Sequence, residues 1–316
     1  MMMRCTCLPL LSALALCACL DEHHDANHDE HEPAPDEPAH DDEADHLQDD
    51  GDLGPARDSS CPEHVPFTAS VRARVVDEDG AGLVDARVQL CVWTVDARML
   101  CLEPGRTDAA GDVLIDVAAP ARCMVSATAR VLLPQSRRPA LYCGVELSLD
   151  DASVTVAAPY TLIEAAAPAA LPALGQEDQA RAVAFDGLAV EVRPAAIGAE
   201  AYQRLAATTL TPEQAPACLA AEAPDFDLLV AFSPEVDVMG AGFPLTLDNE
   251  LGLAPGDAVE LAVQGGLECT LDDGSAVEKA AWHTLGTAIV SADGERIVTS
   301  GATSVPCLGW LGVRRR

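Results

Sequence analysis

The chain has 316 residues, with 51 Asp+Glu against 19 Lys+Arg, which gives a formal net charge of −32. Aromatic residues make up only 3%, and 12 residues are cysteine. Binding to a nucleic-acid backbone requires clustered Lys and Arg, so this charge excludes nucleic acid as an expected partner. No run of about 18 apolar residues follows the N-terminal segment, so a polytopic membrane protein is not expected. The length predicts about two domains.

Residues 1–18 are predicted to be a signal peptide, because Arg4 precedes a short apolar run that is too brief to span a bilayer. The sequence Leu16-Cys-Ala-Cys19 resembles the lipobox of bacterial lipoproteins. This resemblance implies that Cys19 carries a diacylglycerol and becomes the new N-terminus, and two or three acyl chains suffice for stable anchoring. Leu20 at the next position favours the outer membrane, with the protein facing the periplasm or the cell surface. The alternative is ordinary cleavage after Ala18 without lipid.

Residues 19–60 are expected to form a disordered tether. Its section 21–52 holds 15 Asp/Glu and six His but no Lys or Arg, so it cannot bury enough apolar surface to fold. A solvated spacer is the plain interpretation. The alternative is capture of a divalent transition metal (Zn²⁺, Ni²⁺ or Cu²⁺), for which imidazole is a common ligand, and no other cofactor is expected. The six candidate ligands are His23, His24, His28, His31, His40 and His46.

Residues 61–164 are predicted to form a β-sandwich, because short segments of alternating apolar and polar residues are separated by Asp/Gly turns. The predicted strands are 70–76, 86–93, 98–102, 113–117, 124–133, 141–149 and 153–157. The turn carboxylates Asp77, Asp79 and Asp108 could serve as calcium ligands. Ordinary turn chemistry accounts for the same residues.

The order V-V-D-E-D-G-A-G-L-V-D-A-R-V-Q-L, followed by T-D-A-A-G-D-V-L-I-D-V, resembles the carboxypeptidase regulatory-like (prealbumin-like) domain over residues 66–158. The chain departs from that family at 119–123, where the family usually has a G-x-Y step. The resemblance implies a non-catalytic sandwich that spaces, docks or contributes to surface binding.

Residues 165–182, rich in Ala, Pro and Leu, are expected to be a linker, and residues 183–316 a second β-rich domain. Its predicted strands are 183–185, 188–192, 226–232, 243–249, 258–263, 281–286, 288–290 and 296–299, and 202–210 suits either a strand or a helical turn. The motifs P-L-T-L-D-N-E-L-G-L-A-P-G and W-H-T-L-G-T-A-I-V-S-A-D-G-E-R-I-V resemble a β-rich module of large secreted bacterial surface proteins over 184–312. The predicted fold class is all-β, with two sandwich-like domains after a tether.

Eight cysteines remain after Cys5, Cys7, Cys17 and the lipid candidate Cys19 are set aside. An even number in an exported chain predicts four disulfides. They are Cys61, Cys91, Cys101, Cys123, Cys143, Cys218, Cys269 and Cys307. Because five precede residue 165 and three follow it, full oxidation requires at least one bridge between the two halves. The favoured local pairs are 91 with 101 and 269 with 307, and Cys61 or Cys143 is a candidate partner for Cys218.

No catalytic signature is found. His64, in Cys61-Pro-Glu-His64, forms only half of a zinc-type motif, and His283 suits a structural or surface position. We therefore expect a non-enzymatic lipoprotein with a structural or adhesive role at the cell envelope. Its partners are the membrane, through the lipid, and an unidentified protein or glycan. A role as an enzyme accessory or inhibitor rests on the family resemblance alone. Nearly half of the charge excess lies in the tether, since 53–316 carries 36 acids against 18 bases.

Overall fold

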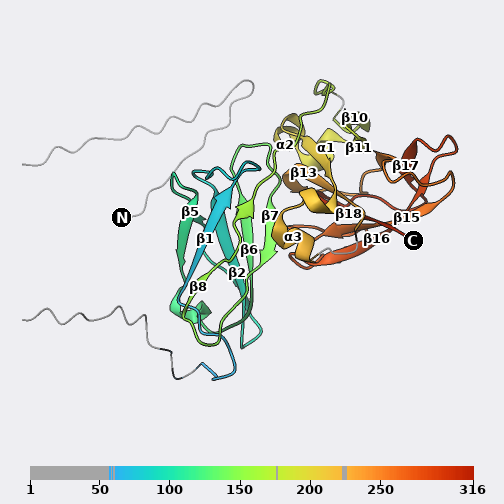
Figure 1. Cartoon of the computed structure of the whole chain (residues 1–316). Helices are drawn as coiled ribbons and strands as arrows, with labels where there is room; N and C mark the ends of the chain where they lie inside the picture. Colours follow the sequence, from blue (N-terminus) through green and yellow to red (C-terminus); the bar gives the residue numbers. More distant parts are fainter. Residues whose placement is uncertain (1–56, 58, 60, 176, 223–225) are drawn as a thin grey trace, which may run out of the picture. The chain divides into compact units, whose positions relative to one another are not determined.

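The computed structural model describes residues 57, 59, 61–175, 177–222 and 226–316. Within these ranges lie eighteen strands and three short α-helices, which confirms the all-β fold class (Figure 1). In the same ranges, no helix has the length and apolar character needed to cross a membrane.

The strands before residue 165 form two sheets that face each other. The first has the order β5-β1-β8, with β9 also paired to β1, and comprises β5 (Asp112–Asp116), β1 (Ser70–Val76), β8 (Ser153–Thr155) and β9 (Tyr160–Thr161). The second has the order β3-β2-β6-β7, with β4 also paired to β2, and comprises β3 (Met99–Cys101), β2 (Arg87–Thr94), β6 (Met124–Leu132), β7 (Leu141–Gly144) and β4 (Gly105–Arg106).

Buried and exposed residues alternate along these strands, and the buried side chains form the core of the sandwich. In β5, Val113 and Ile115 are buried while their neighbours are exposed, as expected for a sheet with one solvated face. These two side chains belong to the same buried cluster as Leu90 and Val92 of the opposite sheet. The core therefore lies between the two sheets.

The strands after residue 180 form one sheet of nine strands, in the order β10-β11-β14-β17-β16-β15-β18-β13-β12. They are β10 (Arg181–Phe185), β11 (Leu188–Val192), β14 (Leu245–Asp248), β17 (Arg296–Thr299), β16 (Trp282–Val290), β15 (Ala258–Gln264), β18 (Cys307–Arg315), β13 (Leu228–Asp237) and β12 (Ala206–Leu210). All adjacent pairs are antiparallel.

The segment predicted as a linker lies against the two end strands of this sheet. Ala166 pairs with Ala207 of β12 through reciprocal backbone hydrogen bonds of 3.1 and 3.0 Å. The Ala169 amide donates to the Ala184 carbonyl of β10 at 3.3 Å. Strands β10 and β12 also contact each other, so the sheet curls around its core and both of its edges are covered.

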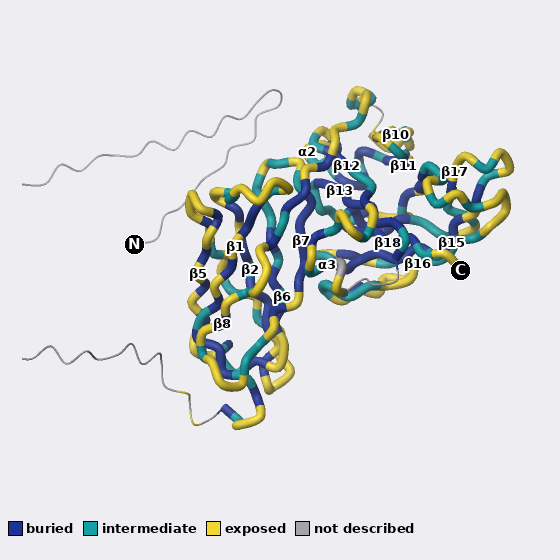
Figure 2. The backbone as a smooth tube through the Cα atoms, viewed as in Figure 1, coloured by how far each residue is buried: buried dark blue, intermediate teal, exposed yellow. Residues whose placement is uncertain are grey.

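Strand β13 is buried on both of its faces (Figure 2). Leu228, Val230 and Phe232 belong to the core enclosed by the nine-stranded sheet. The intervening Leu229 and Ala231 belong to the buried cluster of the sandwich. The outer face of this sheet therefore packs against the first pair of sheets.

The helices are short and occupy connections. They are α1 (Pro194–Ile197), α2 (Ala199–Gln203) and α3 (Ala217–Glu222), with 3-10 turns η1 (Ala119–Ala121) and η2 (Pro212–Gln214). The region 202–210, which the sequence left open, contains both structures: α2 ends at Gln203 and β12 follows.

Several strand predictions differ from the structure. The predicted strand 226–232 is β13, which continues to Asp237, and β18 was not predicted. Strand β7 ends at Gly144 rather than continuing to 149, and the Ser148 hydroxyl accepts the Asp150 and Asp151 amides in a turn. The segments 281–286 and 288–290 form one strand, β16, whose pairing with β15 shifts register between Gly286 and Thr284. A bulge accommodates the irregularity without ending the strand. The proposed domain boundaries stay predictions.

Candidate functional site

The lipidation and metal candidates lie outside the described residues. Cys19 and the six tether histidines all precede residue 57, so lipid attachment and metal capture stay predictions. Among the described residues, no group of three His, Cys, Asp or Glu side chains is arranged to hold a metal ion.

The eight remaining cysteines form four disulfides: Cys61–Cys123, Cys91–Cys101, Cys143–Cys218 and Cys269–Cys307. Two of these are the local pairs favoured from the sequence. The pair Cys143–Cys218 joins β7 of the sandwich to α3, so it is the bridge between the two halves that the cysteine count requires.

The turn carboxylates considered for calcium hold their own turns. Asp77 Oδ1 accepts the amides of Asp79 and Ala81 at 3.1 and 2.8 Å. Asp108 Oδ1 accepts the amides of Ala110 and Asp112 at 2.8 and 2.9 Å. These are the Asx-type contacts for which Asp is favoured in turns.

His283 is exposed on β16 and lines a pocket of about 220 Å³ with Asp272 and Ser304. The Ser304 hydroxyl donates to Asp272 at 3.4 Å. Within the described residues, His283 forms no hydrogen bond with either of them. The nucleophile-to-base contact of a serine hydrolase is therefore not assembled in this structure.

A buried carboxylate lies where the two β-rich parts meet. Glu235 is on β13, within the stretch where the pairing with β18 shifts between Ala231 and Val236. A bulge of this kind redirects a side chain, and Glu235 points to the sandwich. Its side chain is 9% exposed and that of Arg130 is 19% exposed.

Glu235 accepts four hydrogen bonds. Arg130 on β6 donates to Oε2 from Nη2 at 2.9 Å and from Nε at 3.2 Å. The Tyr142 hydroxyl donates to Oε1, and the Leu267 amide donates to the same oxygen at 2.6 Å. Arg130 and Tyr142 face each other across β6 and β7. We call Glu235, Arg130 and Tyr142 the joint cluster.

The joint cluster changes the pKa values of two of its members. Burial raises the pKa of the Tyr142 hydroxyl far above its ordinary value, and the neighbouring Glu235 carboxylate raises it further. Burial alone would lower the pKa of Arg130, but attraction to Glu235 together with the interactions with Tyr142 and the hydrogen bonds to both outweighs this effect and raises it. Tyr142 thus stays a hydrogen-bond donor and Arg130 stays charged. A buried ion pair needs such additional hydrogen bonds to offset its desolvation.

Further contacts lie near the joint cluster, at the interface between the two β-rich parts. The Trp310 indole N–H donates to the Ala140 carbonyl at 2.8 Å in a buried position. On the side of the nine-stranded sheet, the rings of Phe226 and Trp282 meet edge to face with centroids 4.6 Å apart, and both side chains pack with the buried cluster of the sandwich. Gly266 leaves room for the carboxylate, since a Cβ there would lie 2.2 Å from Glu235 Oε1. The Trp310–Ala140 hydrogen bond, the joint cluster and the Cys143–Cys218 disulfide connect the two parts.

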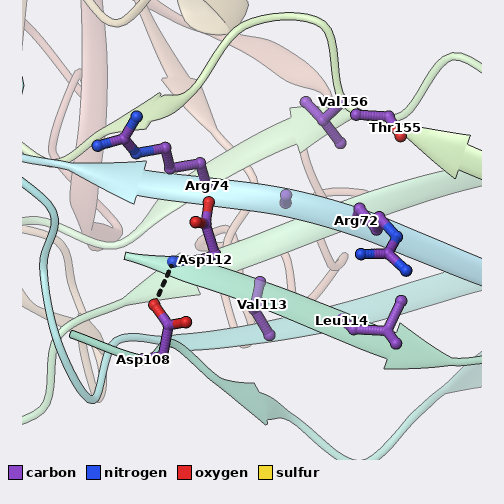
Figure 3. A pocket seen from close by; sticks show the side chains of 9 residues that line it. Arg72, Arg74, Asp108, Asp112, Val113, Leu114, Thr155 and Val156 are labelled. Carbon is purple, nitrogen blue, oxygen red and sulfur yellow. Dashed lines mark hydrogen bonds between the residues drawn. The ribbon is translucent and has the colours of Figure 1, made fainter. Parts of the chain in front are cut away.

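A second feature is an open groove of about 560 Å³ on the outer face of the β5-β1-β8 sheet (Figure 3). Arg72 projects from β1 beside Leu114 and Thr155, and Arg74 lies beside Asp112. Asp108 and Asp112 also line the groove. Neither arginine forms an ion pair within the described residues, although Arg74 donates to the Ala110 carbonyl at 3.2 Å. Two guanidinium groups on one face can bind carboxylate or phosphate groups.

Sequence reasoning missed the joint cluster. Glu235 is 105 positions from Arg130 and 93 positions from Tyr142 in the chain, and each is an ordinary residue in its own segment. The one local signal was a Glu three residues after the apolar run 228–232, followed later by the pair Gly265-Gly266.

No family model matches the chain, and no curated protein matches it. Among solved structures, the chain is similar to one described as the full-length major pilin SpaD from Corynebacterium diphtheriae, at 10% identity and a TM-score of 0.23. The alignment covers 80% of this chain and 58% of the pilin chain, so the match spans less than two thirds of the pilin. A similarity this low transfers nothing from the pilin to this chain. The all-β architecture and four disulfides define the class: a β-rich protein of an exported or cell-surface kind.

Proposed function

We propose that the chain is a membrane-anchored exported lipoprotein whose β-rich body has a non-catalytic structural or binding role at the cell envelope. The observation that best supports the structural role is the rigid contact between the two β-rich parts. The Cys143–Cys218 disulfide and the hydrogen-bonded Glu235 fix one β-rich part on the other. A body of this kind presents one fixed surface at the end of the predicted tether, which suits a spacer or an adhesive module.

The anchor is tested at Cys19. In protein purified from the producing cell, the N-terminal peptide is expected to carry acyl mass on Cys19. The variant Cys19→Ala is expected to leave the membrane fraction, and Cys17→Ala serves as the matched control that stays there. An unmodified Cys19, or a Cys19→Ala variant that stays with the membrane, contradicts the lipoprotein assignment.

The binding role is assigned to the groove of Arg72 and Arg74. Side chains two positions apart on one strand are about 6.6 Å apart, the same spacing as alternate residues of an extended peptide. The groove therefore suits a partner protein segment with carboxylates at alternate positions. Asp108 and Asp112 line the groove near Arg74 and oppose such a partner locally, whereas charges of the body beyond about 8–10 Å are screened at physiological salt.

A labelled peptide of alternating Glu and Ala tests this assignment by fluorescence anisotropy. The double variant Arg72→Ala/Arg74→Ala is expected to bind it at least about tenfold more weakly, because two charge-assisted contacts are lost. Arg98→Ala is the control, since Arg98 is exposed and already paired with Asp96. Equal affinity of wild type and double variant, or binding of an acidic glycan in preference to the peptide, contradicts the assignment of this groove to an acidic protein segment.

Metal capture by the tether is the alternative function, supported by the six histidines within 21–52. Weak Zn²⁺ binding is expected of any such segment, so affinity decides. Calorimetry of the full mature chain is compared with a variant in which all six histidines are alanine. Sub-micromolar binding that disappears in the variant favours the metal role over the spacer role.

A further inference from the structure

The Cys91–Cys101 disulfide differs from the other three in its exposure. Cys101 is exposed, whereas every other disulfide cysteine in the described residues is buried or half-buried. The two residues face each other across β2 and β3, and the next pair on the same face is Trp93 with Met99. External reagents can therefore reach a sulfur atom of this disulfide.

The chain's single lysine lies beside that sulfur. Lys279 Nζ is 3.6 Å from Cys101 Sγ. Lys279 comes from the connection between β15 and β16, where its backbone bridges Gly265 and the following Ala280 amide donates to the Gly265 carbonyl at 2.8 Å. Within the described residues, Lys279 forms no ion pair. An ammonium group next to a sulfur favours the thiolate over the thiol.

We propose that Cys91–Cys101 is a thiol-exchange site that reacts with low-molecular-weight thiols of the glutathione class. The thiolate of the small thiol attacks Cys101 Sγ and forms a mixed disulfide. The Cys91–Cys101 bond breaks, and its electron pair leaves on Cys91 as a thiolate, which then takes a proton from water. A second small thiol can attack the mixed disulfide at the ligand's sulfur, which releases Cys101 as a thiolate and yields the oxidised small-molecule disulfide.

Lys279 assists both steps by the same electrostatic effect. The incoming thiolate is an anion, and negative charge is spread over the sulfur atoms during the exchange, so a cation at the attacked sulfur lowers the barrier. In the second step Cys101 is the leaving group, and a stabilised thiolate leaves faster. Lys279 is a positioning residue in this scheme, since it forms no bond with the thiol.

The chain is expected to stay folded when this disulfide opens. Strand β2 remains paired with β6 along its whole length, and the sandwich core and the other three disulfides do not involve Cys101. The site can therefore change its redox state without loss of the native structure.

The full mature chain tests the proposal. The folded protein is treated with reduced glutathione, quenched by alkylation, and its cysteine peptides are weighed. We expect glutathione on Cys101 and alkylation at Cys91 while the other three disulfides stay intact. Trp93 fluorescence gives an independent readout, since its ring lies on the same face as the disulfide.

Three variants test the part played by the charge. Lys279→Gln is expected to react roughly five- to tenfold more slowly, the effect of one charge at this distance in water. Lys279→Arg keeps the charge and is expected to keep most of the rate. Arg98→Gln removes a cation of the same hairpin that does not contact the sulfur, and its rate is expected to match wild type. Simultaneous reduction of all four disulfides overturns the site, and equal rates in wild type and Lys279→Gln overturn the role of Lys279.

Discussion

Strands β5 and β13 bury their side chains in two different ways. Strand β5 alternates exposed and buried residues because one of its faces meets the sandwich core and the other meets solvent. Strand β13 is buried at six successive positions because its two faces meet two different cores. The comparison shows that the continuous apolar run 228–232 reflects packing on both faces of the strand, and not merely a central place in a sheet.

The two strands also differ in how they treat polar residues. On β5 the outward residues Asp112 and Asp116 are exposed to water. On β13 the polar Glu235 is shielded from water and needs protein partners, which the joint cluster supplies. On β13, the apolar residues that face the sandwich are therefore accompanied by one hydrogen-bonded carboxylate, which fixes how the two β-rich parts meet.

The largest expected effect is a truncation on the doubly buried strand. Leu229→Ala is expected to lower the free energy of unfolding by about 4 kcal/mol, because it leaves a cavity between the sandwich and the nine-stranded sheet. Leu114→Ala on the outer face of β5 is the matched control, with a change within about 0.5 kcal/mol. Urea denaturation measures both. Similar losses in the two variants would remove the distinction between the strands.

The next effect concerns the polar contact. Glu235→Gln leaves the Arg130 charge in its shielded position without its counter-ion, and we expect a loss of about 3 kcal/mol in the free energy of unfolding. Glu164→Gln is the control, since Glu164 and its closer partner Arg137 are both 52% exposed and its second partner Arg138 is 3.8 Å away, and the expected loss is at most about 1 kcal/mol. Equal losses would show that burial of the joint cluster contributes nothing.

A smaller effect is expected from the space that Gly266 leaves. Gly266→Ala places a methyl group 2.2 Å from Glu235 Oε1, so the carboxylate must move away from its donors. The expected loss is about 2 kcal/mol, the range of overpacked sites. Gly309→Ala on β18 is the control, because a Cβ there meets nothing within 4 Å. Thermal unfolding that is the same for both variants would contradict the close approach.

The smallest expected effect is a pH dependence of the free energy of unfolding that arises from a solvent-exposed ion pair, in contrast to the shielded joint cluster. Burial raises the pKa of Glu78, but hydrogen bonds from Arg138 and the Glu164 amide outweigh it and lower the pKa below 4.5. The stabilisation from Glu78 is therefore complete above pH 4.5 and is lost as the pH falls through the lower folded-state pKa. Because Glu78 is 41% exposed, the effect is expected to be below about 1 kcal/mol.

The variant Glu78→Gln checks this dependence through urea unfolding at several pH values. It is expected to be less stable than wild type at pH 7 and to converge with wild type in acid. Glu103 is exposed and forms no ion pair within the described region, so Glu103→Gln serves as the control. A gap that persists unchanged at low pH would show that ionisation of Glu78 is not its source.

Local pattern was sufficient for most strands of this protein. The alternation in 70–76 and 188–192 predicted β1 and β11 at their observed bounds, because the side-chain period of a strand is written directly in the sequence. The turns at Asp77 and Asp108 followed from the preference of Asp for accepting nearby amides.

Pairing at long range was decided by the tertiary structure alone. The odd number of cysteines in each half required a bridge between the halves, but only packing of β7 beside α3 selected Cys143 for Cys218. Likewise, nothing near Glu235 in sequence indicates Arg130 and Tyr142, which approach it only after both β-rich parts have folded and met. Sequence determined the periodic elements because their physics is local, and the fold determined the joint because its partners are distant.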